Sequence, residues 1–387
     1  MDNPSFEPPS GPPPATTPPP PVLPPPPIIP PTPPPKPRRG RGWMIFSIIL
    51  LVLLFLSVLV IIGQFVTQAL PFNHSLTTGT RDIGPRLEEC VLKDNDAHSK
   101  IAVVPVEGII TESDLDGQGN SMVDVIKAEL DRANDDKNVR AVILKVNSPG
   151  GEVMASDEIN KAIADFQNKS DKPVICSMGS LAASGGYYVS VPSRWIVANE
   201  LTITGSIGVI LHSWNYRDLM DKVGLAPVTY KSGKFKDMLD GERSTNEIPP
   251  EEHAMVQGLI DETFQKFKDV VREGREQAHE QNKQEGKSLA SDWEDYADGR
   301  VLSGRQALGL GFVDELGDFD KAVARAKTIA HIHNANLIEY RERYDISEFL
   351  HLFGQSGSAH DVKLDLGVDM PKLQAGQLYF LYLPMSQ

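Results

Sequence analysis

The chain has 387 residues, enough for one large domain or two small ones with tails, and its formal net charge is −14. Residues 1–42 carry four basic and two acidic side chains, so the remaining chain carries −16, which argues against a nucleic-acid partner. The nine histidines include no HExxH pattern, and Cys90 and Cys176 form no CxxC pattern. We therefore expect neither a metal site nor a disulfide framework.

The N-terminal region has two parts with different compositions. Twenty of the 31 prolines lie before Trp43, which predicts a disordered, polyproline-like arm over residues 1–42, either a stiff spacer or a ligand for a proline-binding domain. Met44–Gly63 is uncharged and would span about 30 Å as a helix, so we predict a transmembrane helix over residues 43–65. The basic residues before it favour a cytoplasmic N-terminus and an extracytoplasmic remainder. A cleaved signal peptide is the alternative, although this apolar run is longer than is usual for one.

Residues 66–99 are polar and are interpreted as a stem, and from Ile101 apolar strands alternate with helices. This alternation predicts an α/β fold with a largely parallel sheet that is covered on both faces. We expect one domain over residues 100–334 and a C-terminal tail of unclear role over 335–387. The expected strands and short apolar runs are 101–110, 139–147, 173–178, 194–199, 206–211 and 226–231, and the expected helices are 120–136, 153–168 and 250–281.

Two glycine-rich turns in this domain are candidate parts of an active site. "NSPGGEV" follows a strand, and its glycine pair leaves backbone N–H groups free where a helix begins, which suits a developing oxyanion or an ordinary capped turn equally well. "SLAASGGYYVS" has the same strand-to-helix position, with Ser184 directly before Gly185. Ser184 is either a nucleophile at a helix start or a small residue that allows close packing.

A serine nucleophile needs a base, and the choice here is between histidine and lysine. His212 is the single histidine between Asn147 and Met238, and no acidic residue is clearly tied to it. "KSGKFKD" offers three lysines instead, but a lysine base has to be neutral, which requires burial, and a solvated surface is the simpler interpretation of any one of them. Ser206 in "TGSIG" is a hydroxyl that could hold a neutral amine.

Five motifs occur in order: "NSPGG", "SMGSLAASGGYYVS", "TITGSIGVI", "KSGKFKDM" and "GRVLSGRQALGLGFVDELG". Together they resemble the signal peptide peptidase A (SppA) family of membrane-anchored Ser/Lys proteases, peptidase family S49, in its short single-repeat form. The resemblance implies a crotonase/Clp-protease-like βαβ superhelix and no cofactor or metal. It also implies site roles: Ser184 as nucleophile, Lys236 as general base, Ser206 as the residue that orients Lys236, and the N–H groups of Gly151 and Gly185 as oxyanion donors. Lys231 and Lys234 match no catalytic position.

The resemblance further implies a serine endopeptidase that degrades remnant signal peptides or other apolar unfolded peptides at the membrane. The protein would be a homo-oligomeric ring, held by one helix in the inner or cytoplasmic membrane, with its catalytic domain extracytoplasmic. Two alternatives stay open at this point. One is a non-catalytic membrane scaffold of the same fold, and the other is acyl-CoA chemistry of the crotonase type, which would use the glycine turns but not Ser184 or Lys236.

Overall fold

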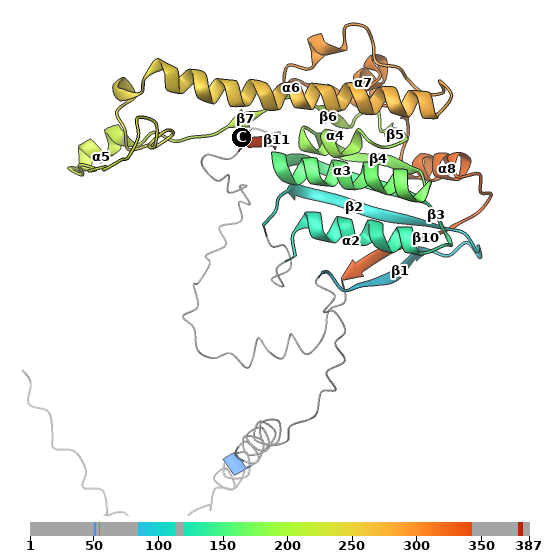
Figure 1. Cartoon of the computed structure of the whole chain (residues 1–387). Coiled ribbons are helices and arrows are strands. Elements are labelled where there is room, and N and C mark those ends of the chain that lie inside the picture. Colours follow the sequence, from blue (N-terminus) through green and yellow to red (C-terminus); the bar gives the residue numbers. More distant parts are fainter. Residues whose placement is uncertain (1–49, 52–53, 55–83, 114–119, 343–377, 382–387) are drawn as a thin grey trace, which may run out of the picture. The chain divides into compact units, whose positions relative to one another are not determined.

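A computed structural model of the chain describes residues 50–51, 54, 84–113, 120–342 and 378–381, which belong to two compact units, Met1–Thr80 and Arg81–Gln387 (Figure 1). The expected proline-rich arm lies outside the described residues. Three residues of the expected transmembrane helix, Leu50, Leu51 and Leu54, are described, and all three are helical. Within the described part of the chain, no helix is both long and apolar enough to cross a bilayer.

The second unit is built on a mixed sheet with a parallel centre. Five successive strand pairs are parallel: β10 with β2, β2 with β3, β3 with β4, β4 with β5, and β5 with β9. At the edge, β1 pairs antiparallel with β10. This confirms the expected α/β class. In spatial order the strands are β1 (Leu87–Lys93), β10 (Asn336–Glu342), β2 (Lys100–Ile110), β3 (Val139–Glu152), β4 (Val174–Ala183), β5 (Trp195–Ala198) and β9 (Glu315–Leu316).

Helices cover both faces of this sheet, because its central strands are apolar on both sides. In β3, Val142 and Leu144 face the core formed with α2 (Met122–Asp135) and α3 (Val153–Ser170), which lie side by side in Figure 1. Ile143, between them, packs in the opposite core with α8 (Phe319–Ile329). Alternate side chains of one strand therefore bury against different helices, as expected for a covered parallel sheet.

Local signals fix where several helices begin. Ser121 caps α2 by accepting from the backbone N–H of Asp124 at 3.2 Å, while the Asp124 carboxylate accepts from the backbone N–H of Ser121 at 3.0 Å. The long helix α6 (Pro250–Gln281) starts with proline in its first turn, where the missing N–H costs nothing, and its bounds are those expected from the sequence. The remaining helices are α4 (Gly185–Ser190), α5 (Arg217–Val223) and α7 (Gly304–Leu310).

The sheet extends beyond the expected domain of residues 100–334. Strand β1 lies within the expected stem, and β10 and β11 (Leu378–Leu381) lie within the expected tail. Residues 226–231, expected as a strand, form none, because Val228 and Tyr230 are 74% and 94% exposed and have no neighbouring strand to pair with. The remaining short strands are β6 (Ile203–Gly205), β7 (Ile210–Leu211) and β8 (Val301–Ser303).

Candidate active site

Ser184 lies at a tight turn between strand β4 and helix α4. Its backbone has φ 55° and ψ −119°, its N–H donates to the carbonyl oxygen of Gly205 at 2.8 Å, and its carbonyl accepts from the N–H of Tyr188 at 2.9 Å. A non-glycine residue held at positive φ costs about 1–3 kcal/mol, which a glycine would largely avoid. The strand-to-helix turns that present nucleophilic serines in other folds are strained in a similar way.

The two glycine turns expected from the sequence come together beside this serine. Gly150 has φ +96°, and a Cβ on Gly185 would lie only 3.1 Å from the Gly150 Cα. A Cβ on Gly186 would lie 2.6 Å from the carbonyl oxygen of Ser148, so α4 can approach the end of β3 this closely only with glycines in its first turn. Gly151 continues β3 and is paired with β2 on one side and β11 on the other.

Ser206 lies next to Ser184 in the fold although it is 22 positions further along the chain. Ala183 of β4 and Gly205 of β6 are partners in parallel pairing, so Ser184 and Ser206 directly follow paired residues at neighbouring strand ends. Ser206 also has positive φ, 50°, and its N–H donates to the carbonyl oxygen of Arg300 at 2.8 Å. The structure therefore brings the two predicted serines together and holds both in a conformation that serine rarely adopts.

Lys236 forms no hydrogen bond with either of these serines in the described chain. It is exposed on the loop between α5 and α6, and it lines a depression of about 500 Å³ together with Tyr230 and Asp237. Among the described residues, the Lys236 ammonium makes no hydrogen bond or ion pair, with Ser184 or otherwise. In contrast, Lys231 pairs with Asp237 at 2.8 Å and Lys234 lies 3.6 Å from Glu251. Of the three lysines, Lys236 is the one whose amine is uncommitted in the described chain.

The segment that carries Lys236, residues 212–240, exposes an unusual amount of apolar surface, and we call it the α5 extension. Helix α5 has no buried residue. Exposed apolar side chains gathered on one segment are typical of surfaces that contact another protein or a membrane. The exposed fractions are 79% for Trp214, 62% for Leu219, 63% for Val223, 58% for Leu225, 74% for Val228 and 94% for Tyr230.

His212 and Cys176 are poor candidates for the catalytic groups. His212 is exposed and makes no hydrogen bond within the described part of the chain. Both cysteines are free, and burial raises the pKa of the Cys176 thiol to about 12, so that this thiol stays protonated and is a poor nucleophile.

An aromatic cluster beside Ser184 was not expected from the sequence. The ring of Phe380 in β11 stacks on Tyr188 of α4 with centroids 4.9 Å apart, and it lies 4.6 Å from the ring of Phe267 in α6. Tyr188 donates its hydroxyl hydrogen to the Asp157 carboxylate at 2.8 Å, which fixes its ring. The uninterrupted apolar and aromatic run "LYFLYL" at Leu378–Leu383 is the sequence signal that could have indicated a strand there.

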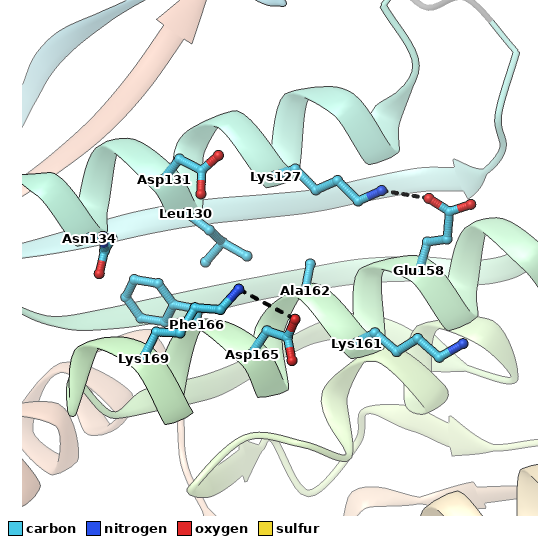
Figure 2. A pocket seen from close by; sticks show the side chains of 10 residues that line it. All are labelled: Lys127, Leu130, Asp131, Asn134, Glu158, Lys161, Ala162, Asp165, Phe166 and Lys169. Carbon is cyan, nitrogen blue, oxygen red and sulfur yellow. Dashed lines mark hydrogen bonds and ion pairs between the residues drawn. The ribbon is translucent and has the colours of Figure 1, made fainter.

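A groove of about 360 Å³ lies away from these residues, between α2 and α3 (Figure 2). Its charged side chains pair with one another across or along the helices, as in Lys127 with Glu158 at 2.5 Å and Lys169 with Asp165 at 3.5 Å. Leu130 and Phe166 form its apolar floor. Because four of its charged side chains form these two ion pairs, this groove is interpreted as a solvated helix seam rather than a reaction site.

Comparisons with known proteins agree with the serine chemistry. Residues 166–333 match the family described as Peptidase family S49. An Enterococcus faecium protein named as a signal peptide peptidase, SppA, is 35% identical over 258 residues, which is 66% of this chain and 71% of that protein. A Synechocystis protein named as a protease is 37% identical over 60% of this chain and 74% of its own length.

A more distant relative is the chloroplastic serine protease SPPA of Arabidopsis thaliana, 31% identical over 60% of this chain but only 33% of that protein. A solved structure of a membrane-bound stomatin-specific protease has a TM-score of 0.32 and 17% identity, over 59% of this chain and 85% of that chain, too low to inform on the arrangement here. With the match to the family and the coverage of its bacterial members, the chain belongs to peptidase family S49 and is a serine-type peptidase.

Proposed function

We propose that this chain is a membrane-anchored serine endopeptidase that uses Ser184 as nucleophile and Lys236 as general base. The observation that carries the proposal is the positive-φ turn of Ser184, packed against the Gly150 turn and beside Ser206. In this proposal Ser206 orients the lysine amine, and the N–H groups of Gly151 and Gly185 stabilise the oxyanion.

The reaction proceeds through an acyl-enzyme. The neutral amine of Lys236 takes the proton of the Ser184 hydroxyl as its oxygen attacks the peptide carbonyl carbon, and the C=O π electrons move onto the carbonyl oxygen. The C–N bond then breaks, and protonated Lys236 gives its proton to the leaving amine. Water repeats the sequence on the ester and releases the acid and free Ser184. Loss of one oxyanion donor in a site of this kind typically costs about 3 kcal/mol of transition-state stabilisation.

In this proposal, assembly with further copies of the chain buries the Lys236 amine, which is exposed in a single chain. A lysine base has to be desolvated to stay neutral, and Lys236 is exposed in the single chain. The α5 extension presents its apolar side chains to the surface around the same loop. In a ring of subunits this surface would be covered, and Lys236 would be buried beside a nucleophilic serine.

The substrates we propose are remnant signal peptides and other uncharged apolar chains at the membrane. Support comes from the 20 uncharged residues of Met44–Gly63, which suit a single membrane anchor with the proline-rich arm in the cytoplasm. The relative named as a signal peptide peptidase points the same way. With such an anchor, the catalytic unit would face the extracytoplasmic side of the inner or cytoplasmic membrane.

The test compares the full-length chain with Ser184→Ala and Lys236→Ala on a fluorogenic apolar peptide. Both variants should lose at least about 10³-fold in kcat while keeping the wild-type melting temperature. Ser180→Ala and Lys231→Ala are the matched controls, since Ser180 is an exposed serine of β4 and Lys231 is engaged with Asp237. Full activity in Lys236→Ala would assign the base to another group, and an inert wild type that still assembles would favour a scaffold.

A further inference from the structure

An arginine further along the chain holds the residue that directly follows Lys236. Arg243 donates from Nη1 to the carbonyl oxygen of Asp237 at 3.1 Å, and its Nε lies 3.4 Å from the Asp237 carboxylate. Asp237 is therefore held through both its main chain and its side chain. Because consecutive Cα atoms are only about 3.8 Å apart, these contacts also fix where the side chain of Lys236 begins. We call residues 231–243 the lysine loop.

The same arginine connects the lysine loop to the start of helix α6. Nη1 of Arg243 donates to Oε2 of Glu252 at 2.7 Å, and Nη2 donates to the carbonyl oxygen of Glu247 at 2.9 Å. The side chains of Arg243 and Glu252 are only 12% and 4% exposed. Removing one partner of such a pair leaves the other charge poorly solvated and unpaired. The planar guanidinium holds these oxygens at once, which a lysine ammonium does less well.

Glu252 also holds a strained backbone position within the lysine loop. Its Oε1 accepts from the backbone N–H of Leu239 at 3.2 Å, and Leu239 has a positive φ of 66°. A bulky side chain rarely adopts this conformation, which persists where the surrounding contacts impose it. Leu239 lies three positions after Lys236, so the contacts of Glu252 impose the shape of the loop close to the lysine.

The opposite side of the lysine loop is joined to the beginning of the α5 extension. The side-chain amide of Asn215 donates to the carbonyl oxygen of Arg243 at 2.9 Å, and the N–H of Tyr216 donates to that of Gly241 at 3.0 Å. A Cβ on Gly241 would lie only 2.1 Å from the carbonyl oxygen of Trp214, so this approach requires glycine. The loop, the α5 extension and the start of α6 therefore contact one another around Arg243.

Lys231 differs from Arg243 although both contact the Asp237 carboxylate. The Lys231 side chain is 37% exposed, and ion pairs of this kind contribute little because water and salt screen them. Loss of Lys231 would leave all three hydrogen bonds of Arg243 in place. The loop should therefore keep its shape without Lys231 but not without Arg243.

We infer that Arg243 and Glu252 are positioning residues for Lys236, a role that rests on the proposed function of Lys236 as the base. They hold the lysine loop in one conformation, so that the amine is presented at a fixed place when neighbouring copies of the chain bury it. A base on a loose loop would have to be ordered during the reaction, which slows proton transfer. Substrate binding does not involve these two side chains, so their loss should lower kcat and leave KM unchanged.

The first experiment measures steady-state kinetics of the full-length chain on an uncharged apolar peptide. Arg243→Ala and Glu252→Gln should each lower kcat about 10- to 100-fold, with KM changed less than about twofold. Arg243→Lys should recover part of the loss, because it keeps the charge but not the planar fork. Equal losses in Arg243→Lys and Arg243→Ala, or a rise in KM with kcat unchanged, would contradict the positioning role.

Arg272→Ala is the matched control for these variants. Arg272 also pairs with two acids, Asp269 and Glu294, both at 2.8 Å. It lies 20 positions beyond Glu252 on helix α6, which corresponds to about 30 Å along the helix. Arg272→Ala should therefore retain the kcat of the wild type. A loss in this control equal to that in Glu252→Gln would mean that any ion pair of α6 matters equally.

Limited digestion with trypsin reports the order of the lysine loop without using catalysis. The loop contains Lys231, Lys234 and Lys236, and a loosened loop exposes the peptide bonds after them. In Glu252→Gln, which keeps the size of the side chain, cleavage within the loop should be about tenfold faster than in wild type. Cleavage at the wild-type rate in both Glu252→Gln and Arg243→Ala would overturn the inference, as would a fall in kcat that only follows a lower melting temperature.

The rate at which a fluorophosphonate probe modifies Ser184 separates this inference from the proposed function. Glu252→Gln should slow the modification in the wild-type chain but cause no further loss in Lys236→Ala, because groups that act through one residue are not additive. A further loss in that background would mean that Glu252 supports the fold rather than the lysine. Lys236→Ala that reacts as fast as wild type would overturn the base itself. An inert Lys236→Ala with fully reactive Glu252→Gln would overturn the positioning role alone.

Discussion

The backbone N–H of Ser184 donates to the carbonyl oxygen of Gly205 at 2.8 Å, so the turn that carries the predicted nucleophile is held by the residue directly before Ser206. The pairing of Ala183 with Gly205 in neighbouring parallel strands places both serines at one end of the sheet. Ligands of open α/β sheets bind at this end, beyond the carboxyl ends of the strands.

Ser206→Ala should lower kcat about 10- to 100-fold without a large change in KM. The hydroxyl is proposed to orient the lysine amine, and a misplaced base slows proton transfer more than substrate binding. Steady-state kinetics on an apolar peptide give the two constants separately. Ser180→Ala, which removes an exposed hydroxyl from β4, should leave both unchanged. A Ser206→Ala enzyme with wild-type kcat would remove Ser206 from the mechanism.

Ser184→Gly should be inactive but more stable than Ser184→Ala by about 1 kcal/mol. Alanine at φ 55° keeps the steric strain between its Cβ and the backbone, whereas glycine has no Cβ and releases this strain. The greater conformational entropy of glycine in the unfolded chain offsets part of the gain. Urea unfolding of both inactive variants measures the difference directly. Equal stabilities would show that the turn of Ser184 is not strained.

The unfolding free energy should depend on pH through Glu129, a carboxyl of α2 that is 2% exposed. Burial, with Glu339 and Glu342 of β10 adding to it, raises the pKa of this carboxyl well above its usual value of 4.5. The folded chain then holds a proton that the unfolded chain has released. The contribution of Glu129 to the free energy of unfolding is therefore fully present below about pH 4.5. It is lost as the pH rises towards the folded-state pKa, with a slope of at most about 1.4 kcal/mol per pH unit.

Glu129→Gln should remove this slope, because the amide is neutral at every pH. Urea unfolding between pH 5 and 8 compares wild type, Glu129→Gln and the exposed control Glu276→Gln. The control should keep the wild-type slope. A slope that survives in Glu129→Gln would mean that other groups cause it.

Charged substitutions on the α5 extension should break the assembly that we propose. Trp214→Asp combined with Tyr230→Asp places two carboxylates on a surface that a second copy would cover, since these side chains are 79% and 94% exposed. Light scattering should report monomers, and kcat should fall at least about 10²-fold because the base is no longer buried. Leu201→Asp should assemble and cleave as wild type does. Monomers that retain full activity would show that one chain suffices.

The sequence predicted the central elements well because their patterns are local. The β-branched run at Val139–Val146 and the helical spacing of Ile159, Ile163 and Phe166 each report burial directly. The position of Ser184 after a strand also follows, but that of Ser206 does not. The run expected as a strand, 206–211, begins at Ser206, whereas the structure has β6 at Ile203–Gly205, directly before Ser206, and β7 only at Ile210–Leu211. Their positive φ angles do not follow, because no residue pattern distinguishes a strained serine from one in an ordinary turn.

Other features depend on contacts between distant parts of the chain. Strand β1 has a polar sequence because it lies at the sheet edge, where most of its side chains face water. Strand β11 has only four residues, and its place is set by edges more than 160 residues away. The environment of Lys236 is least predictable, since in our proposal a second copy of the chain determines it.

The pairing of Leu378–Leu381 with β3 and β7 also has a consequence for protein engineering. A chain that ends before Gln377 would leave the partner edges of both strands unpaired and would uncover the apolar surfaces of Tyr188 and Phe267 that Phe380 covers. Unpaired strand edges and exposed aromatic side chains favour aggregation. Expression of the catalytic unit therefore requires the C-terminal segment through Leu381.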